Sequence, residues 1–442
     1  MAASNSPGSR WADGCVAAGI ALLGGALLGL LALPTALLLR GIPRKPGRRL
    51  LCLVPAGFEA ILTKGVGSLI SEREEAGFWD GVETLYFPSE QNRRTRWSPV
   101  QTIRTLRPIA RFLKGAGWTA CHHTLNGLRL AVWGLSRSLS IRREVTVIRG
   151  QDPFPMGLLA AWLAGLTGVR WGVSLHGDPD LSRRLDDRET ARWGRSRRLA
   201  ETAQRWVLRR AEAVWVVRPS LTEWVTRRGA DRDRIAVLPH GVDLSFWKTP
   251  ETDAVRFRKE AGLSGKPLLL FIGRLEKVNY PEDFLRIAAE VKRSHPDLQA
   301  VVIGDGSQRR ALEAAAGRLG LSDSVRWLGF LPRESLRLWR AASDVQICLM
   351  GGFSLLEAAA AGKPVVAYDL AWHRELIRDG ATGRLIPEGA IAAAAQAVCR
   401  LLEQPEGAQA MGEAAQAAVR DHYDWPIASE RRQAAYQRLI GV

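Results

Sequence analysis

The chain of 442 residues contains little cysteine, and what it has is scattered. Its five cysteines, Cys15, Cys52, Cys121, Cys348 and Cys399, lack the paired spacing of a disulfide framework or a zinc cluster. A short-period repeat and a low-complexity tail are also missing. Hydrophobic residues make up 46% of the chain, which is enough for compact domains. We therefore predict two folded domains with an appendage, in a reducing compartment.

Acidic residues are in short supply. The chain has 45 Asp and Glu residues against 62 Lys and Arg residues, so its formal net charge is +17. This excess predicts an anionic partner, either nucleic acid or lipid. The sequence contains no recognisable nucleic-acid-binding module, so we predict no nucleic acid partner.

Two Arg-rich stretches with nearby tryptophans favour an anionic membrane surface. In the first, Arg104, Arg107, Arg111 and Lys114 recur at spacings of three and four, which predicts one face of a helix. The second covers residues 183–210. A solvated helix face in an Arg-rich chain is the alternative interpretation.

Residues 15–39 carry no charged side chain and are rich in Leu, Ala and Gly. A helix of this length spans a bilayer core of about 30 Å, so we predict a single-pass transmembrane anchor. Five basic residues follow it, Arg40, Arg44, Lys45, Arg48 and Arg49, whereas only Arg10, offset by Asp13, precedes it. Positive charge stays cytoplasmic, which places the two folded domains on the cytoplasmic face. A cleaved signal peptide is the rival, but its apolar run would be shorter and its charge would lie on the other flank.

The order of apolar and polar segments predicts the domain organisation. Residues 1–14 form a short tail, and 40–49 form a basic linker behind the anchor. Residues 50–247 and 266–425 each alternate apolar strands with helical stretches, which predicts two Rossmann-like α/β domains with parallel sheets. We expect a connection at 248–265 and a C-terminal helix at 426–442 that packs back on the first domain. The Gly25 to Gly29 spacing in the anchor would allow a homodimer.

Three loops of the second α/β domain follow apolar strands, where open α/β sheets bind ligands. They are Gly273–Lys277, Ile303–Gly306 and Gly351–Ala358. Glycine allows the sharp turn, Arg274 can donate to a diphosphate, and a Gly-rich helix start presents free N–H groups to an anion. Each loop alone is weak evidence, because turns before helices often contain glycine.

Taken together and in order, the motifs are specific. The second domain resembles the C-terminal domain of the retaining family 4 glycosyltransferases, which have the GT-B fold of two Rossmann-like domains facing across a cleft. The matching motifs are VLPHGVD at 237–243, GRL at 273–275, IGDG at 303–306, WLGF at 327–330, GFSLLEA at 352–358, GKPVVA at 362–367 and DGATGRL at 379–385. A fainter match in the first domain is SLHGD at 174–178.

The resemblance implies roles for matching residues. Arg274 would hold the donor diphosphate, Glu357 would bind the ribose, and His176 would face the transferred sugar. Without the resemblance, His176 could equally be a satisfied loop residue. The expected donor-binding residues are Gly273, Lys277, Asn279, Gly304, Gly306, Trp327, Leu328, Gly351, Gly352, Phe353, Ser354 and Leu355, with Trp327 and Leu328 framing the nucleobase.

Two positions depart from the family pattern. Asn279 stands where the family usually has a lysine, and Leu349 stands where it usually has the first of two glutamates eight residues apart. The resemblance still implies a retaining transferase that uses a UDP- or GDP-sugar without metal or further cofactor. The basic surface and the anchor predict a lipid-linked or membrane-associated acceptor. The alternatives are a catalytically silent GT-B scaffold in a membrane glycan-assembly complex and a GT-B nucleotide-sugar epimerase.

Overall fold

The computed structural model describes residues 7–63, 77–109, 119–180, 197–370 and 372–441. The described residues form two compact units. The first unit contains those up to Leu238 and from Glu430 onward, and the second contains Pro239–Ser429. The second unit thus begins earlier than the expected connection at 248–265. That stretch instead holds helix α11 (Glu251–Glu260), where Arg258 pairs with Asp344 at 2.7 Å within the second unit.

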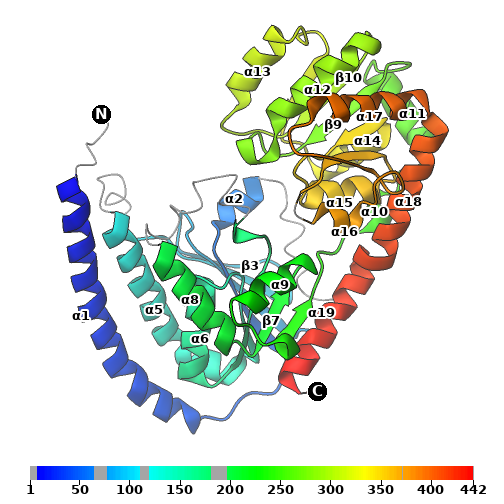
Figure 1. The fold of residues 1–442 in the computed structure, drawn as a ribbon. Coiled ribbons are helices and arrows are strands. Elements are labelled where there is room, and N and C mark those ends of the chain that lie inside the picture. Colours follow the sequence, from blue (N-terminus) through cyan, green and yellow to red (C-terminus); the bar gives the residue numbers. More distant parts are fainter. Residues whose placement is uncertain (1–6, 64–76, 110–118, 181–196, 371, 442) are drawn as a thin grey trace. The chain divides into compact units, whose positions relative to one another are not determined.

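Helix α1 (Pro7–Arg40) begins the chain and runs beside α5 (Thr119–Glu144) (Figure 1). The two helices approach closely at Gly24, where an added Cβ would lie 2.6 Å from the Leu128 side chain. At the carboxyl end of α1, Arg142 of α5 donates to the carbonyls of Arg40 and Ile42. In the part of the chain that is described, Val16–Arg40 is the one stretch long and apolar enough to cross a membrane, by length and composition alone. Its exposed leucines are Leu22, Leu23, Leu27, Leu30, Leu31, Leu33, Leu37 and Leu38.

The first unit contains a sheet of eight strands in the order β3-β4-β2-β1-β5-β6-β7-β8. All pairs are parallel except β3 with β4. The strands are β1 (Arg49–Val54), β2 (Gly81–Tyr86), β3 (Arg93–Arg96), β4 (Gln101–Thr105), β5 (Val147–Gly150), β6 (Arg170–Leu175), β7 (Ala213–Val216) and β8 (Ile235–Val237).

Helices cover both faces of this sheet. Apolar side chains of α5, α6 (Met156–Thr167), α8 (Arg197–Arg210) and α9 (Ser220–Arg227) pack on one face. Phe58 of α2 (Phe58–Thr63) packs on the other face, as does Tyr436 of α19 (Trp425–Ile440). Tyr436 is fully buried against Trp79 and Trp215, so the end of α19 belongs to this core.

The expected basic helix face at 104–114 is not what forms. Arg104 lies in strand β4, whose alternate residues Gln101, Ile103 and Thr105 are buried. Burial in this segment alternates with a period of two residues, and the segment pairs with β2. These two features favour a strand over the helix that the spacing of the arginines predicts. Arg107 follows the strand, while Arg111 and Lys114 lie outside the described residues.

Only part of the second basic stretch is described, because residues 181–196 lie outside the described ranges. The rest forms α8, where Arg205, Arg209 and Arg210 are exposed. Trp206 is also exposed, and the Arg210 guanidinium lies 4.7 Å from its ring centre.

The second unit contains six parallel strands in the order β11-β10-β9-β12-β13-β14. They are β9 (Leu268–Ile272), β10 (Gln299–Ile303), β11 (Val325–Gly329), β12 (Val345–Ile347), β13 (Val365–Tyr368) and β14 (Arg384–Ile386). Helices α12 (Pro281–Ser294), α13 (Arg309–Arg318) and α17 (Ile391–Glu403) cover one face. Helices α11, α14 (Arg333–Ala342), α15 (Phe353–Ala360) and α18 (Pro405–Tyr423) cover the other. Both units therefore have the three-layer Rossmann-like architecture that the sequence predicts.

Candidate functional site

The strand order of the second unit reverses between β9 and β12. From β9 the chain continues outward through β10 and β11, and from β12 it continues the other way through β13 and β14. Ligands of open α/β sheets bind at such a reversal, beside the carboxyl ends of the two strands. The loops that leave β9 and β12 contain the predicted residues Gly273, Arg274, Gly351 and Gly352.

The loop after β9 packs tightly against the loop after β10. Gly273 N–H donates to the carbonyl of Ile303 at 3.0 Å. A Cβ at Gly304 would lie 2.0 Å from the Gly273 carbonyl oxygen, and one at Gly306 would lie 2.5 Å from that of Leu275. Gly304 and Gly306 are therefore needed for this packing, and their predicted donor contacts remain a prediction.

Arg274 is exposed, and its guanidinium has no hydrogen bond or ion pair within the described chain. Its backbone is fixed instead, because the Asn279 side-chain amide donates to the Arg274 carbonyl at 2.7 Å. Lys277 is also exposed, in the short 3₁₀ helix at Lys277–Asn279. Asn279 thus holds the loop, and the positive charges available beside it are Arg274 and Lys277.

Gly351, the first glycine after β12, is held on both sides by the protein. Its N–H donates to His373 Nε2 at 3.1 Å, and its carbonyl accepts from the Trp372 indole at 2.9 Å. Nδ1 of the buried His373 donates to the Tyr368 carbonyl at 2.6 Å, which leaves Nε2 as the acceptor. A Cβ at Gly351 would lie 2.3 Å from Leu355 Cβ. Because its N–H is used, an anion would have to meet the amides that follow Gly351.

Those amides belong to the amino end of α15. Gly352 is the N-cap residue, is exposed, and offers no side chain to cap the helix. The first N–H groups of a helix have no partner within it, and the positive end of the helix dipole lies there. Phe353 is 39% exposed, with its ring 4.7 Å from that of His240, whereas Leu355 is fully buried.

Glu357 lies one turn into α15 and is held by a buried arginine. Arg340 Nη2 lies 2.8 Å from Glu357 Oε2, with Arg340 fully buried and Glu357 18% exposed. Arg340 also donates to Gln346 and, at 3.3 Å, to Ser354 Oγ. Ser354 Oγ in turn donates to the Ile272 carbonyl at 2.8 Å, which ties α15 to the end of β9. The remaining oxygen of Glu357 has no hydrogen bond to any residue of the described ranges.

Sequence reasoning did not identify Arg340. It is one of three arginines on α14, and nothing in their spacing indicates which one is buried. The fold shows that it alone reaches Glu357 and Ser354.

Trp327 and Leu328, expected together around a nucleobase, lie on opposite faces of the sheet. Trp327 packs toward the α12–α13 face, with the Arg309 guanidinium 4.9 Å from its ring centre. Leu328 packs toward the α11–α14 face. Neighbouring strand residues point in opposite directions, so both side chains cannot line one ligand surface.

Leu349 is fully buried in the apolar core on the α12 face. It presents no polar group to a ligand, and its burial explains why an apolar residue suits this position.

His176 directly follows β6 in the first unit, as predicted. Its Nε2 lies 3.1 Å from Ser174 Oγ, and its carbonyl accepts from Arg218 at 3.2 Å. Ser174 Oγ also accepts from Arg149 Nε at 3.1 Å, and Arg149 donates to the Tyr436 hydroxyl at 2.7 Å. The imidazole is thus positioned by a polar network of the first unit.

Asp152, another residue that sequence reasoning missed, follows β5 next to the strand-order reversal of the first unit. Its Oδ1 accepts from the Met156 amide at 2.8 Å at the start of α6. Burial raises the pKa of Asp152 to about 7, although hydrogen bonds from Met156 and Gly157 act against the shift. Asp152 lies three residues before the N-cap Pro155, which has no capping side chain, so the sequence carries no ordinary cap signal for it. The described residues contain no group of three His, Cys, Asp or Glu side chains that could hold a metal ion.

Two family models match the chain. The model "Glycosyltransferase Family 4" covers residues 89–246, and "Glycosyl transferases group 1" covers residues 254–418.

Three curated relatives are enzymes. The alpha-D-kanosaminyltransferase of Streptomyces kanamyceticus is 28% identical over 70% of this chain and 81% of its own length. The D-inositol 3-phosphate glycosyltransferase of Nocardia farcinica is 37% identical over 42% of this chain and 43% of its own. The GDP-mannose-dependent alpha-(1-6)-phosphatidylinositol monomannoside mannosyltransferase of Mycolicibacterium smegmatis is 32% identical over 42% and 52%. The chain thus spans about half the length of the last two relatives.

Solved structures share the fold at low sequence identity. HepE of Anabaena in complex with UDP-glucose has a TM-score of 0.68 at 17% identity, covering 89% of this chain and all of that one. Sucrose-phosphate synthase of Thermosynechococcus elongatus has a TM-score of 0.70 at 18% identity, with the same coverage.

Proposed function

The chain is a glycosyltransferase with the GT-B fold, and on this premise we propose that it moves a sugar from a UDP- or GDP-sugar to a lipid-linked or membrane-associated acceptor. The observation that supports a nucleotide-sugar donor is the arrangement of groups at the β9/β12 reversal. There three groups belong to the loop after β9 and to α15. They are Arg274, which pairs with no described residue, the uncapped helix start at Gly352, and the Glu357 carboxylate, one oxygen of which has no hydrogen bond within the described ranges.

Each of these groups suits one part of a nucleotide-sugar. The Arg274 guanidinium and the α15 N–H groups complement a diphosphate, and the free Glu357 oxygen can accept from a ribose hydroxyl. Among the relatives, HepE is described with UDP-glucose and the mycobacterial mannosyltransferase as GDP-mannose-dependent, which supports this donor class.

The proposed chemistry is electrostatic. Negative charge grows on the diphosphate as the sugar–phosphate bond breaks, so donors held at that position lower the barrier as well as bind the substrate. Arg274, Lys277 and the start of α15 supply this stabilisation, so no metal ion or further cofactor is needed. We expect retention of configuration, as in the family that the sequence resembles, with a donor phosphate oxygen assisting removal of the acceptor proton. His176 is the first-unit residue assigned to the transferred sugar.

Helix α1 and the basic linker at 40–49 support the proposal of a lipid-linked or membrane-associated acceptor. The exposed leucines of α1 suit lipid contact, and Arg40, Arg44, Lys45 and Arg48 suit anionic headgroups. The mannosyltransferase relative has a phosphatidylinositol monomannoside in its name, a lipid acceptor. We place the two units on the cytoplasmic face, with α1 as the anchor.

Two observations favour a silent scaffold as the second candidate. Leu349 is buried in the core, and Asn279 binds its own loop, so neither supplies the polar group usual in the resembled family.

A nucleotide-release assay with purified protein separates the candidates. We expect release of UDP or GDP from one donor, and a loss of about a hundredfold or more in Arg274→Ala. Lys259→Ala, which removes an exposed cation of α11 outside the site, is the matched control and should keep wild-type turnover. Absence of turnover with every donor would favour the scaffold, and acceptor-independent sugar interconversion would favour an epimerase. Transfer to soluble acceptors but never to lipid-linked ones would contradict the acceptor assignment.

A further inference from the structure

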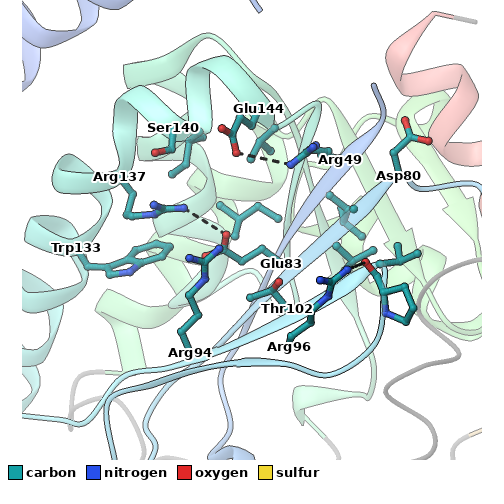
Figure 2. A pocket seen from close by; sticks show the side chains of 18 residues that line it. Arg49, Asp80, Glu83, Arg94, Arg96, Thr102, Trp133, Arg137, Ser140 and Glu144 are labelled. Carbon is teal, nitrogen blue, oxygen red and sulfur yellow. Dashed lines mark hydrogen bonds and ion pairs between the residues drawn. The ribbon is translucent and has the colours of Figure 1, made fainter. Parts of the chain in front are cut away.

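A separate cavity of about 500 Å³ lies in the first unit, at the amino ends of its strands (Figure 2). Its walls come from the starts of β1 and β2, from the β3–β4 hairpin and from the second half of α5. Ligands of parallel sheets bind at carboxyl ends, so this cavity is distinct from the site at the β9/β12 reversal. Its size is within the range of small-molecule sites.

The sheet itself makes this cavity polar. The strand registers place Leu51, Glu83, Thr102 and Arg96 in one row across the face that α5 covers. The next row runs Leu53, Leu85, Arg104 and Arg94 in the same direction. Both rows begin in the apolar core and end in charged side chains. A face under a helix is ordinarily apolar, so the charges there require an explanation.

Positive charge is in excess around Glu83. The Glu83 carboxylate lies 2.6 Å from Arg104 Nε and 3.4 Å from Arg137 Nη2. Arg94 is exposed and has no ion pair or hydrogen bond to the described residues. Figure 2 shows the Arg94 and Arg137 side chains both directed toward Glu83. Three guanidinium groups therefore surround one carboxylate, so the wall near Glu83 is positively charged. The cavity lining as a whole holds four arginines against three carboxylates: Arg49, Arg94, Arg96 and Arg137, with Asp80, Glu83 and Glu144.

The cavity also has neutral donors. The Trp133 indole N–H is buried and has no hydrogen-bond partner, although Trp133 lines the cavity. An unpaired buried donor is unfavourable, so a ligand acceptor that reaches it gains a hydrogen bond. Ser140 and Thr102 bring hydroxyl groups to the same wall.

The cavity lies beside the segment that follows α1. Lys45 N–H donates to the Arg143 carbonyl at 2.7 Å, and Lys45 and Arg49 both pair with Glu144. Arg49 and Glu144 also line the cavity. If α1 is in a membrane, as proposed above, this end of the first unit lies near headgroups.

We propose that this cavity binds a phosphate group, held by the Arg94 and Arg137 guanidinium groups. A phosphate brings negative charge to the positively charged wall near Glu83, and arginine donates to its oxygens in pairs. The phosphate belongs either to a lipid headgroup or to a soluble phosphate ester. Only the lipid source depends on the proposed membrane function.

The test is calorimetric titration of the full chain, in phosphatidylcholine nanodiscs, with glycerol 3-phosphate. Saturating UDP is present, so that the site at the β9/β12 reversal does not contribute. We expect binding that weakens about tenfold or more in Arg94→Ala, the loss typical of one charged hydrogen bond. Arg93→Ala removes an exposed arginine from the opposite face of the same strand and should bind like wild type.

A second set of nanodiscs contains phosphatidylglycerol. Loss of glycerol 3-phosphate binding there in the wild type assigns the cavity to a lipid headgroup, and unchanged binding assigns it to a soluble ester. The proposal is overturned if glycerol 3-phosphate fails to bind in phosphatidylcholine nanodiscs, or if Arg94→Ala and Arg93→Ala bind equally well. These results do not depend on turnover, so they are independent of whether the chain transfers sugar.

Discussion

At the scale of single residues, the pair of Arg340 and Glu357 determines whether the proposed ribose contact can form. A buried ion pair is not necessarily stabilising as a whole, but removing one partner leaves an uncompensated charge. Arg340 therefore acts on the site through Glu357 as a positioning residue. Its contacts to Gln346 and Ser354 make it the centre of the polar network below the β9/β12 reversal.

We predict that Arg340→Met lowers the free energy of unfolding by about 3–5 kcal/mol. The double variant Arg340→Met/Glu357→Gln should recover part of this loss, because it removes the unpaired carboxylate. Urea unfolding of both variants measures the coupling. Arg337→Met, on the same helix but with no ion pair in the described chain, should cost much less. Additive effects in the double variant would contradict the coupling.

Asp152 gives a second prediction. Its pKa rises from the usual 3.8 to about 7, so the folded protein keeps a proton that the unfolded chain releases between these values. Stability from this group is therefore present at acidic pH and is lost as the pH rises from about 4 to about 7. Asp152→Asn does not titrate. The difference in unfolding free energy, wild type minus variant, should fall by on the order of 3 kcal/mol between pH 5 and pH 8. Parallel pH profiles for the two proteins would show that Asp152 does not titrate in this range.

How well single residues could be predicted depended on their chemistry. Arg274 and Glu357 stand in recognisable motifs, one in the loop after β9 and the other in the first turns of α15, so their positions at the β9/β12 reversal follow from the sequence. The burial of Arg340 and Leu349 depends on packing from α14 and α12, which periodicity does not resolve. The binding roles themselves remain predictions.

At the scale of elements, the start of α15 combines two conflicting needs. A helix start is stabilised by a capping side chain, whereas an anion site needs the same N–H groups free. Gly352 leaves them free. A Cβ at this position would meet no other atom within 4 Å, so the glycine is not required by packing.

Gly352→Asp should therefore separate stability from binding. The new carboxylate can cap α15, so we expect the melting temperature to stay level or rise. The same carboxylate repels a diphosphate, so the KM for the donor should rise about tenfold or more. Gly352→Ala is the control and should change KM little. A normal KM in Gly352→Asp would argue against an anion at this helix start.

Some strands are easier to predict from the sequence than others. β9 and β13 are continuous apolar runs, and β10 is apolar after Gln299, which is typical of buried parallel strands. β3 and β4 escaped prediction because they carry arginines on the face that lines the cavity. Here the polar pattern reflects a local environment rather than the absence of a strand.

At the scale of the whole molecule, α1 raises the question of what its leucines contact. The helix packs on α5 and α6, and its remaining side is apolar and exposed. An exposed apolar surface of this extent is typical of contact with lipid or with another protein. The length and composition of this segment could be predicted, but its packing on α5 could not, because it depends on close approach at Gly24.

Membrane insertion can be tested with the exposed leucines. Leu27 and Leu30 are 61% and 72% exposed, so their replacement should not disturb the fold. We expect the wild-type chain to remain in the membrane pellet after alkaline carbonate extraction. Leu27→Asp/Leu30→Asp should be released, because each charge costs about 3 kcal/mol at the centre of a membrane helix. Leu27→Ala/Leu30→Ala should stay in the pellet. Retention of the aspartate variant would indicate that α1 does not insert.

Strand β3 has a further consequence for the protein during folding and at high concentration. It lies at the edge of the first-unit sheet, where unpaired backbone groups can recruit a strand from another copy. Arg93, Arg94 and Arg96 place positive charge along that edge. Two copies would have to bring like charges together to join their sheets. Arg94 and Arg96, which line the cavity, thus also help to protect the chain against edge-to-edge aggregation.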